Sequence, residues 1–368
     1  MSVNVKFMDL RVQDSNERKM LLKVFNRVMD HGQFIMNKEV HNFEEAFSNY
    51  CGRRYCAGVD SGTSALFIAL KAMNIGPGDE VITTSLSWIA TANAIAMTGA
   101  TPVFCDIKDD LNIDPSSVER MVTKKTRAIL VVHYTGRIVD IDAFISISEK
   151  YGIPIVEDSA QAFGSIYKDK VAGSFGYVAC FSMNPMKVLA ACGEAGAIVT
   201  DDEELYQQIC SLRYNGTVNK EICIQPGLNG RIDSLQAGIL LDRMKVVDKK
   251  INKIRNNASL YNKLLPKEVI PLPEGKDAKY SYYSYTVQVD KRDELIEFLS
   301  YMKIETKIQH PILMCDQKPY KNCPKDSMKN ARRIVRKILS LPVNDTVTKA
   351  QINYVSNAIS KFYIKNNE

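Results

Sequence analysis

The chain has 368 residues, of which 45% are hydrophobic and 24% are charged. This composition is typical of a globular protein with a large core and room for a smaller domain. The net charge of +6 is mild and is not gathered in a basic run, so we expect no nucleic-acid binding.

No apolar stretch reaches roughly 18 residues and the N-terminus lacks a signal pattern, so we expect no membrane partner and a cytoplasmic location. The nine cysteines and four histidines lack metal-ligand spacing, so no metal is expected.

Strand-like and helix-like segments alternate between about residues 55 and 200. In chain order we expect helices at 61–73, 88–98, 115–122 and 141–151, and strands at 80–84, 101–106, 127–133 and 153–157. This alternation is typical of parallel βαβ units. The continuous apolar run at 128–132 further predicts a strand that is covered on both faces.

The pattern changes beyond residue 201. We expect helices at 203–213, 231–265, 292–302, 326–339 and 348–363, strands at 281–289 and around 306–309, and a linker at 266–279. The sequence therefore predicts an α/β fold. A large domain at 1–245, with an N-terminal helical segment, would hold a mostly parallel mixed sheet between helices. A smaller C-terminal α/β domain would cover 246–368.

Lys187 and Asp158 carry the clearest chemical signal. Lys187 follows one apolar strand and precedes a second that is opened by Gly193, while Asp158 ends the strand predicted at 153–157. Pyridoxal phosphate requires an amine that forms a Schiff base with its aldehyde and a carboxylate that keeps its ring nitrogen protonated. We therefore predict that Lys187 and Asp158 are catalytic. An N-cap remains the alternative for Asp158, because strand ends often precede a helix.

The turn at 60–65 leads directly into a predicted helix. Its small residues, Gly62 and Thr63 among them, let backbone N–H groups approach an anion at a helix N-terminus, which predicts a phosphate cradle. Ser182, five residues before Lys187, could hold a phosphate oxygen as well. An ordinary N-cap would produce the same turn residues. The P-loop and dinucleotide-binding glycine patterns are both absent from the sequence.

Three further side chains lie at or near strand ends. Trp88, the only tryptophan, could stack on a cofactor ring or fill the core. Gln161 lies one turn beyond Asp158 and could bind the same ligand. We interpret His133, at the end of the strand predicted at 127–133, as a hydrogen-bonded core histidine.

These segments together resemble the DegT/DnrJ/StrS-type sugar aminotransferases, a branch of the fold-type I pyridoxal-phosphate enzymes. The resemblance covers nearly the whole chain, from about Phe7 to the C-terminus. Each motif alone is weakly specific, but all of them occur in order and at the family's spacing. The motifs are SGTSAL at 61–66, GPGDEV at 76–81, WIATANA at 88–94, GATPVF at 99–104, VEDSAQAFG at 156–164, GSFG at 173–176, Lys187 with GEAGA at 193–197, and NGRIDSLQA at 229–237.

The resemblance implies a role for each matching position. Lys187 would hold the cofactor and shuttle protons, and Asp158 would pair with the ring nitrogen. The remaining cofactor-binding residues would be Gly62, Thr63 and Ser182 at the phosphate, Trp88 and Gln161 at the ring, and Asn229 at the phosphate of the neighbouring subunit. The family's active site is thus expected to require a homodimer. The implied reaction moves an amino group from glutamate to a keto group of a nucleotide-linked deoxy sugar, for amino-sugar and surface polysaccharide (lipopolysaccharide O-antigen) synthesis, through pyridoxamine phosphate.

Several positions depart from the family pattern where substrate is expected, so the particular sugar stays open. Alternatives are an aminotransferase for a non-nucleotide keto sugar or a cyclitol, and a pyridoxal-phosphate-dependent sugar dehydrase. The dehydrase usually carries His in place of the lysine, and Lys187 argues against it. Arg137 could face a substrate anion or form a surface salt bridge. The departing positions are Arg137, Ala195, 213–216, 283–285 and 309–311.

Overall fold

The fold is centred on a seven-stranded sheet. The computed structural model describes residues 4–367, and the main sheet has the strand order β1-β9-β8-β5-β4-β2-β3. Within this sheet, β9 runs antiparallel to both of its neighbours, and the other pairs are parallel. The predicted mostly parallel mixed sheet is therefore confirmed. Its strands are β1 (Tyr55–Val59), β2 (Glu80–Thr84), β3 (Thr101–Cys105), β4 (Thr126–Val132), β5 (Ile155–Asp158), β8 (Val178–Ser182) and β9 (Gly196–Thr200).

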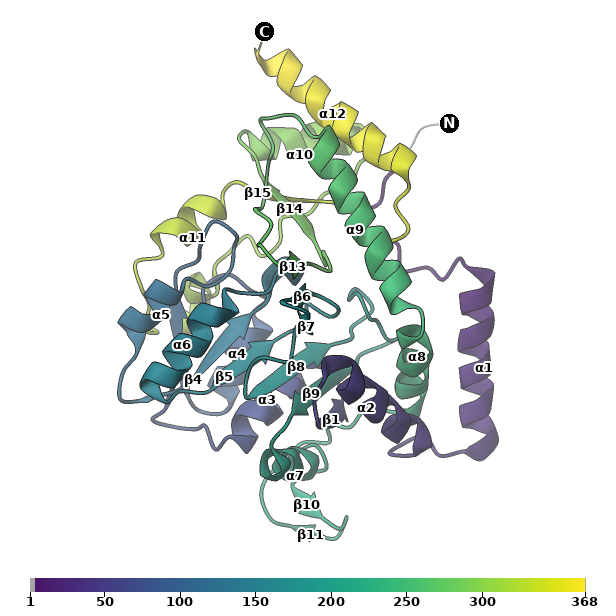
Figure 1. Cartoon of the computed structure of the whole chain (residues 1–368), viewed down its shortest axis with the longest axis vertical. Helices are drawn as coiled ribbons and strands as arrows, with labels where there is room; N and C mark the ends of the chain where they lie inside the picture. Colours follow the sequence, from purple (N-terminus) through teal and green to yellow (C-terminus); the bar gives the residue numbers. More distant parts are fainter. Residues whose placement is uncertain (1–3, 368) are drawn as a thin grey trace.

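Helices cover both faces of this sheet (Figure 1). Along β4, Leu130 and Val132 join a core cluster with α3, α4 and α7, whereas Ile129 and Val131 join a second cluster with α5 and α6. Successive side chains of a strand point to opposite faces, so β4 is buried on both, as its apolar run predicts. These helices are α3 (Gly62–Ala72), α4 (Ala90–Met97), α5 (Pro115–Met121), α6 (Ile141–Tyr151) and α7 (Glu203–Leu212).

Three more helices lie along the β1–β9–β8 side of the sheet. α1 follows an N-cap at Asp14 and buries Val24 and Val28 against Ile239 of α8. α2 buries Phe47 in a cluster with residues of β8 and β9. Packing on α8 therefore ties the N-terminal segment to the large sheet. The helices are α1 (Ser15–His31), α2 (Lys38–Cys51) and α8 (Ser234–Met244).

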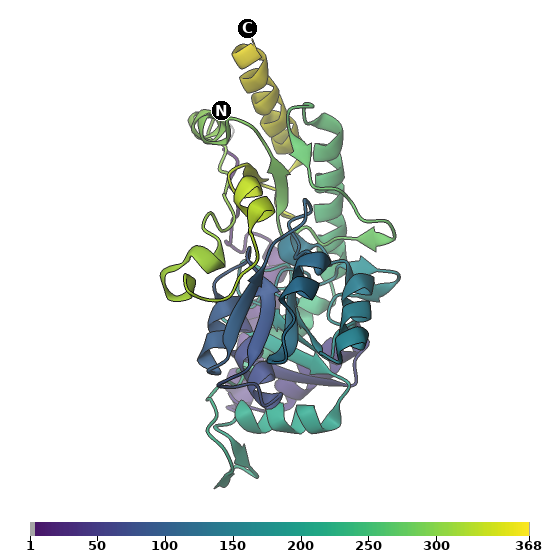
Figure 2. The same ribbon diagram turned by 90° about the vertical axis from the view of Figure 1, so that its left-hand side faces the viewer.

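The C-terminal part forms a smaller sheet with its own apolar cluster, at one end of the molecule in both views (Figures 1 and 2). The sheet order is β12-β14-β15, and both pairs are antiparallel. α9 joins the two regions, because Ile251 packs in the large domain's cluster and Ile254 in the small one. The domain limit at residue 245 stays a prediction. The elements are α9 (Val247–Leu264), β12 (Ile270–Pro271), β14 (Tyr285–Gln288), α10 (Arg292–Tyr301), β15 (Ile338–Leu341) and α12 (Lys349–Asn367).

Four local predictions in the C-terminal part are wrong. The helix predicted at 231–265 is two helices, separated at Val246, whose φ and ψ are −124° and −1°. The helix predicted at 326–339 ends early as α11 (Lys329–Ile334), and its continuation is β15, because pairing with β14 overrides the helical pattern. Around 306–309, only Lys307 pairs, with Ser340. The predicted linker contains β12 and β13 (Ala278–Lys279).

β13 belongs to a third, small sheet that joins the two regions. It pairs with β6 (Ile166–Tyr167), which in turn pairs with β7 (Lys170–Val171). The supposed linker is therefore fastened to the large domain by backbone hydrogen bonds. Among the described helices, none is long and apolar enough to cross a membrane.

Candidate active site

The candidate site lies at one edge of the large sheet. Asp158 ends β5 and Ser182 ends β8, and the two strands are parallel neighbours in which Asp158 pairs with Cys180. Lys187 lies in the loop that leads from β8 to β9. Parallel strands present their carboxyl ends at one edge, where α/β proteins place ligands. The topology thus brings three residues that are distant in sequence to the same edge.

Asp158 is a buried carboxylate with defined partners. Its Oδ2 accepts a hydrogen bond from the Thr91 hydroxyl of α4 at 2.9 Å, and its Oδ1 accepts one from the Ala160 N–H at 3.2 Å. Burial raises the pKa of Asp158, and the hydrogen bond from Thr91 and the charge of Lys187 oppose that rise. The N-cap alternative does not hold, because no helix begins after Asp158, and its Oδ2 instead accepts from the Thr91 side chain of a neighbouring element.

The loop around Lys187 is fixed by backbone and side-chain contacts. The Met183 N–H donates to the Ala195 carbonyl at 2.8 Å and the Lys187 N–H to the Asn184 carbonyl at 2.8 Å. From α8, the Arg243 guanidinium donates to the Ala190 carbonyl at 2.6 Å. These hydrogen bonds therefore fix the backbone of the loop that carries Lys187.

The Lys187 amine is perturbed by its surroundings. Its Nζ lies 4.6 Å from the centre of the Tyr283 ring. Burial lowers the pKa of Lys187 to about 8, although the nearby Asp158 carboxylate favours the charged form. An exposed lysine has a pKa near about 10.4. At neutral pH a larger fraction of this amine is therefore unprotonated, as nucleophilic or base chemistry requires.

Gly62 and Ser182 form a close approach between α3 and β8. A Cβ on Gly62 would lie 2.6 Å from the Ser182 Cβ, so a larger residue at position 62 would collide with the strand. The Ser61 side chain caps α3 by accepting from the Ser64 N–H. The N–H groups of Gly62 and Thr63 lie in the first helical turn, where no helical carbonyl can accept from them. These two N–H groups are therefore placed to donate hydrogen bonds to an anion such as a phosphate.

The other three candidate residues differ in position. Gln161 is buried, and its side-chain oxygen accepts from the Thr135 N–H at 2.8 Å. Trp88 is 61% exposed beside the site. Asn229 is also exposed, and its side-chain oxygen accepts from the Arg231 guanidinium at 2.6 Å. Among residues 4–367, no hydrogen bond joins Asn229 to the Lys187 loop.

Sequence reasoning missed several residues around Lys187. Tyr283 and His310 come from the C-terminal part, and the Tyr134 hydroxyl lies 2.9 Å from His310 Nδ1. The His310 ring lies 5.8 Å from the Trp88 ring, between centres. Burial and nearby cations lower the pKa of His310 to about 4, so it is neutral at pH 7. The only sequence signal for these positions was their departure from the family pattern.

Arg137 does not form the surface salt bridge that the sequence suggested. It is buried and donates to the Leu272 carbonyl at 3.2 Å and the Pro273 carbonyl at 2.5 Å. Its guanidinium also stacks 4.7 Å from the centre of the Tyr280 ring. The prediction of a surface salt bridge is wrong, because Arg137 is buried and its partners are backbone carbonyls and aromatic rings from the predicted linker and the strand after it. A role toward a substrate anion stays a prediction.

His133 is the hydrogen-bonded core histidine that the sequence indicates. Its Nε2 lies 2.8 Å from Glu157 Oε2, and both side chains are fully buried. The His133 Nδ1 accepts from the Val139 N–H at 3.3 Å, so Nε2 carries the proton that it donates to Glu157. Glu157 directly precedes Asp158 on β5, so its buried contact with His133 stabilises the end of this strand.

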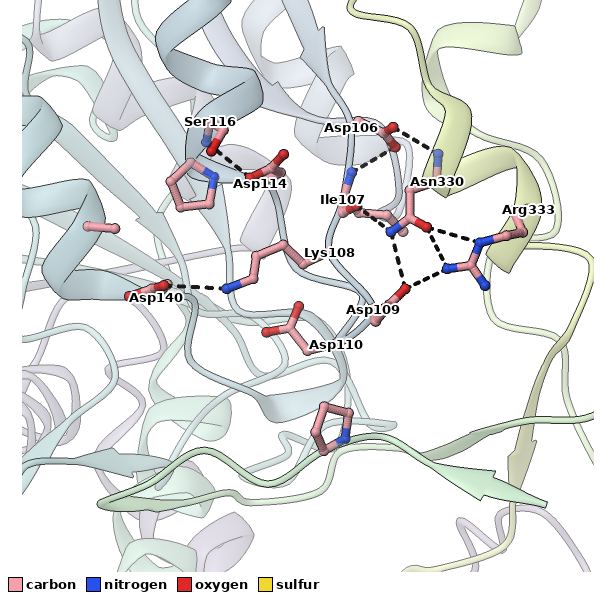
Figure 3. A pocket seen from close by; sticks show the side chains of 13 residues that line it. Asp106, Ile107, Lys108, Asp109, Asp110, Asp114, Ser116, Asp140, Asn330 and Arg333 are labelled. Atoms are coloured by element: carbon pink, nitrogen blue, oxygen red, sulfur yellow. Dashed lines mark hydrogen bonds and ion pairs between the residues drawn. The ribbon is translucent and has the colours of Figure 1, made fainter. Parts of the chain in front are cut away.

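A separate pocket of about 760 Å³ lies at the β3 end of the sheet (Figure 3). Carboxylates line it, but other protein groups already occupy most of them. Asp106 accepts from the Asn330 and Ala331 N–H groups of α11, and Asp109 pairs with Arg333. None of the predicted site residues lines this pocket. We interpret it as the junction between α11 and the sheet.

Comparison with known proteins identifies the family. The model of the DegT/DnrJ/EryC1/StrS aminotransferase family matches residues 15–360. A dTDP-3-amino-3,6-dideoxy-α-D-galactopyranose transaminase of Aneurinibacillus thermoaerophilus is 36% identical over 97% of this chain and 99% of its own. A protein of Geobacillus stearothermophilus named a pleiotropic regulatory protein is 35% identical over 98% of this chain and 99% of its own.

The fold agrees with that match. The crystal structure of S. venezuelae DesV in complex with a ketimine intermediate superimposes with a TM-score of 0.94 and 34% identity, covering 98% of each chain. The chain belongs to the DegT/DnrJ/EryC1/StrS aminotransferase family. The predictions of this family, of its fold class and of a pyridoxal-phosphate-dependent aminotransferase are therefore confirmed.

The residues present fit pyridoxal phosphate. A buried carboxylate, a lysine of lowered pKa and a glycine-bordered helix N-terminus lie at one sheet edge. These are the three groups that the cofactor's ring nitrogen, aldehyde and phosphate need. The individual role of each residue stays a prediction.

Proposed function

We propose that this protein transfers an amino group from glutamate to a keto group of a nucleotide-linked deoxy sugar. The observation that carries the proposal is the Lys187–Asp158 pair at the edge of a family fold. It is supported by the A. thermoaerophilus relative, whose name specifies a dTDP-linked amino deoxy sugar.

The proposed cofactor contacts follow the geometry of the sheet edge. Gly62, Thr63 and Ser182 would bind the phosphate, and Asp158 would hold the ring nitrogen in its protonated form. Gln161 and Trp88 would contact the ring from the loops that follow β5 and β2. When bound, pyridoxal phosphate supplies an electron sink for the carbon that bears the amine, and its pyridoxamine form carries that amine between the two half-reactions.

Lys187 would act through its Nζ atom. Once free, this amine would move a proton from the amine-bearing carbon of the donor to the cofactor in the first half-reaction. In the second half-reaction it would move a proton from the cofactor to the sugar carbon that receives the amine. A pKa of about 8 suits both directions better than that of an exposed lysine, because a larger fraction of the amine is neutral while the protonated form is still available. Thr91 would keep the Asp158 carboxylate oriented and ionised by donating its hydroxyl hydrogen.

We further propose that the protein acts as a homodimer with active sites at the subunit interface. Three apolar side chains of α1, Leu22, Phe25 and Met29, are between 45% and 56% exposed on one helical face. The hairpin of β10 (Thr217–Val218) and β11 (Ile222–Cys223) projects from the large domain (Figure 1) and also exposes apolar groups. Large exposed apolar faces commonly mark interfaces. Asn229, near this hairpin, would then reach a neighbouring site.

A cytoplasmic location and a role in surface polysaccharide synthesis, such as that of O-antigen, complete the proposal. Both follow from the expected substrate, since nucleotide sugars are activated precursors of glycans. Transfer to a cyclitol or a non-nucleotide sugar remains the second candidate. Dehydrase chemistry is disfavoured, because Lys187 is present.

The test is to incubate the purified holoenzyme with glutamate and a panel of keto sugar nucleotides, and to measure product mass. We expect an amino sugar nucleotide and 2-oxoglutarate in equal amounts. Amination of only free keto sugars or cyclitols would overturn the nucleotide assignment. Sedimentation at several concentrations tests the dimer, which a monomer active at full rate would contradict.

A further inference from the structure

Tyr283 lies where the C-terminal part meets the loop that carries Lys187. The centre of its ring is 4.6 Å from the Lys187 Nζ atom, which lies over the ring. At this distance a cation is attracted to the face of an aromatic ring. The ring also packs against the apolar cluster that contains Val188 and Leu189, the two residues after the lysine. A direct contact therefore joins this tyrosine to the amine and to its loop.

The backbone around Tyr283 is fixed by the turn that follows β4. Gly136 in this turn has a φ of +89°, and a Cβ at this position would lie 2.9 Å from the Tyr283 nitrogen, so only glycine permits the approach. The Ser165 hydroxyl accepts from the Ser281 N–H at 2.9 Å and donates to the Gly136 carbonyl at 2.6 Å. The segment before Tyr283 is thus bonded to the large domain, which limits where the ring can lie.

Several charges also act on the Lys187 amine. Asp158 at the end of β5 and Glu194 in the lysine's own loop favour its charged form, whereas burial and the charge of Lys307 oppose that form. His310 of the C-terminal part is neutral at pH 7, because burial and nearby cations lower its pKa to about 4. Together, burial and these charges lower the pKa of Lys187 to about 8.

The Tyr283 ring favours the charged amine without adding a charge of its own. Burial raises the pKa of its phenol, so the ring is uncharged at neutral pH and its electron-rich face attracts a cation. Partial burial strengthens this attraction, because less water competes for the ammonium. A ring in this position therefore stabilises the ammonium form of Lys187 much more than the neutral amine.

We propose that Tyr283 is a positioning residue that holds the Lys187 ammonium against its ring face and controls how readily the amine gives up its proton. This inference rests on the proposed role of Lys187, and it does not depend on the identity of the amino donor or of the sugar. Tyr283 belongs to the segment 283–285, where the chain departs from the family pattern. The family pattern alone therefore does not indicate this contact.

The contact matters because the amine has to change its protonation state during the proposed reaction. It takes a proton from the donor carbon and passes it to the cofactor, so it exists as an ammonium between the two transfers. A ring that stabilises this ammonium makes the amine a better proton acceptor. Replacing the ring by an aliphatic side chain should therefore lower the pKa of Lys187 below its present value.

The experiment measures the protonation of Lys187 itself. The full-length chain is freed of cofactor, and its amines are labelled with a small amount of acetic anhydride over a range of pH. Because only a neutral amine reacts, the pH dependence of labelling at Lys187, determined by mass spectrometry, gives the pKa of this side chain. Lys253, an exposed lysine of α9, is measured in the same samples as an internal reference.

Four variants separate the ring face from the rest of the side chain. Tyr283→Phe keeps the ring, and Tyr283→Leu removes it. A third variant replaces Tyr283 by difluorophenylalanine, which keeps the shape of the ring but weakens its electron-rich face. Tyr151→Leu is the matched control, because the exposed Tyr151 ring lies 4.9 Å from the Lys150 Nζ atom at the surface.

For Tyr283→Leu we expect the labelling profile of Lys187 to move about one pH unit lower, the effect of losing a partly desolvated cation–π contact. Difluorophenylalanine should move the profile in the same direction by a smaller amount. Tyr283→Phe and Tyr151→Leu should leave it in place, and Lys253 should not change in any variant. A tyrosine with a merely structural role would tolerate the fluorinated ring without any change at Lys187.

An unchanged profile in Tyr283→Leu, or a move to higher pH, would overturn the proposal. An unchanged profile with difluorophenylalanine would do the same, and this variant decides the question if Tyr283→Leu does not fold. The proposed function fails by a separate route. If the wild-type holoenzyme transfers no amino group from glutamate, the assigned reaction falls, while the labelling comparison still decides whether the ring holds the ammonium.

Discussion

The edge of the large sheet and the C-terminal region contribute differently to the site. At the sheet edge, the buried carboxylates Asp158 and Glu157 each have a partner on a neighbouring element, in Thr91 and His133 respectively. The C-terminal region brings Tyr283, whose ring lies 4.6 Å from the Lys187 amine, and His310, which contacts Tyr134. The first region holds the proposed catalytic groups in place. Under the proposed function, the second region would face the substrate.

Arginine side chains join these two regions. Arg137 of the large domain donates to two carbonyls of the segment that precedes β13, and Arg255 of α9 donates to the Tyr280 carbonyl at 2.9 Å and the Gly164 carbonyl at 2.9 Å. The segment 272–280 is therefore held to the large domain by hydrogen bonds and not only by apolar contact. Substitutions on each side should separate the chemistry at the sheet edge from the attachment of this segment.

The largest expected effect comes from Lys187→Ala. Loss of the amine that we propose holds the cofactor and moves the proton should lower turnover by about 10⁴-fold or more. The visible absorbance of the cofactor–lysine linkage should disappear as well. Circular dichroism should show an intact fold. A variant that keeps both the band and substantial turnover would remove Lys187 from the mechanism.

Asp158→Asn should have the next largest effect. The amide cannot hold a proton on a ring nitrogen by its charge, so we expect turnover to fall by about 10²- to 10³-fold. Cofactor affinity should fall less, because Gly62, Thr63 and Ser182 would still bind the phosphate. Single-turnover kinetics with glutamate and a cofactor titration separate the two quantities. Unchanged turnover would argue against the assigned role.

Arg137→Met tests whether the segment 272–280 depends on this arginine for its attachment to the large domain. The substitution leaves the Leu272 and Pro273 carbonyls without their donors and removes the stacking on Tyr280. We expect a loss of about 3 kcal/mol in the free energy of unfolding, measured in urea. Arg127→Met is the matched control, because Arg127 is exposed and pairs with Asp79. The control should lose less than about 1 kcal/mol, and equal losses would contradict the argument.

The two regions also differ in how far the sequence predicts them. At the sheet edge, apolar runs such as 128–132 end in polar residues, so local patterns were sufficient to place Asp158 and Ser182 together. In the C-terminal region, β15 forms because it pairs with β14, which lies about fifty residues earlier, and its own pattern looks helical. Thr91 was missed because its contact with Asp158 joins segments that are distant in sequence. No local period encodes such contacts.

Thr91→Val should produce the smallest effect and the most specific one. Burial raises the pKa of Asp158, and the Thr91 hydroxyl opposes that rise by donating to the carboxylate. Removing the hydroxyl should therefore raise the pKa further, so the carboxylate becomes protonated at a higher pH as the solution is acidified. We expect turnover near neutral pH to fall only a few fold, while the acid limb of the pH–rate profile moves to higher pH. Thr91→Ser keeps the hydroxyl and should leave the limb in place. If the acid limb of the valine variant stays at the same pH, the charge of Asp158 does not depend on Thr91. The hydrogen bond between these two side chains would then contribute less to the sheet edge than its geometry indicates.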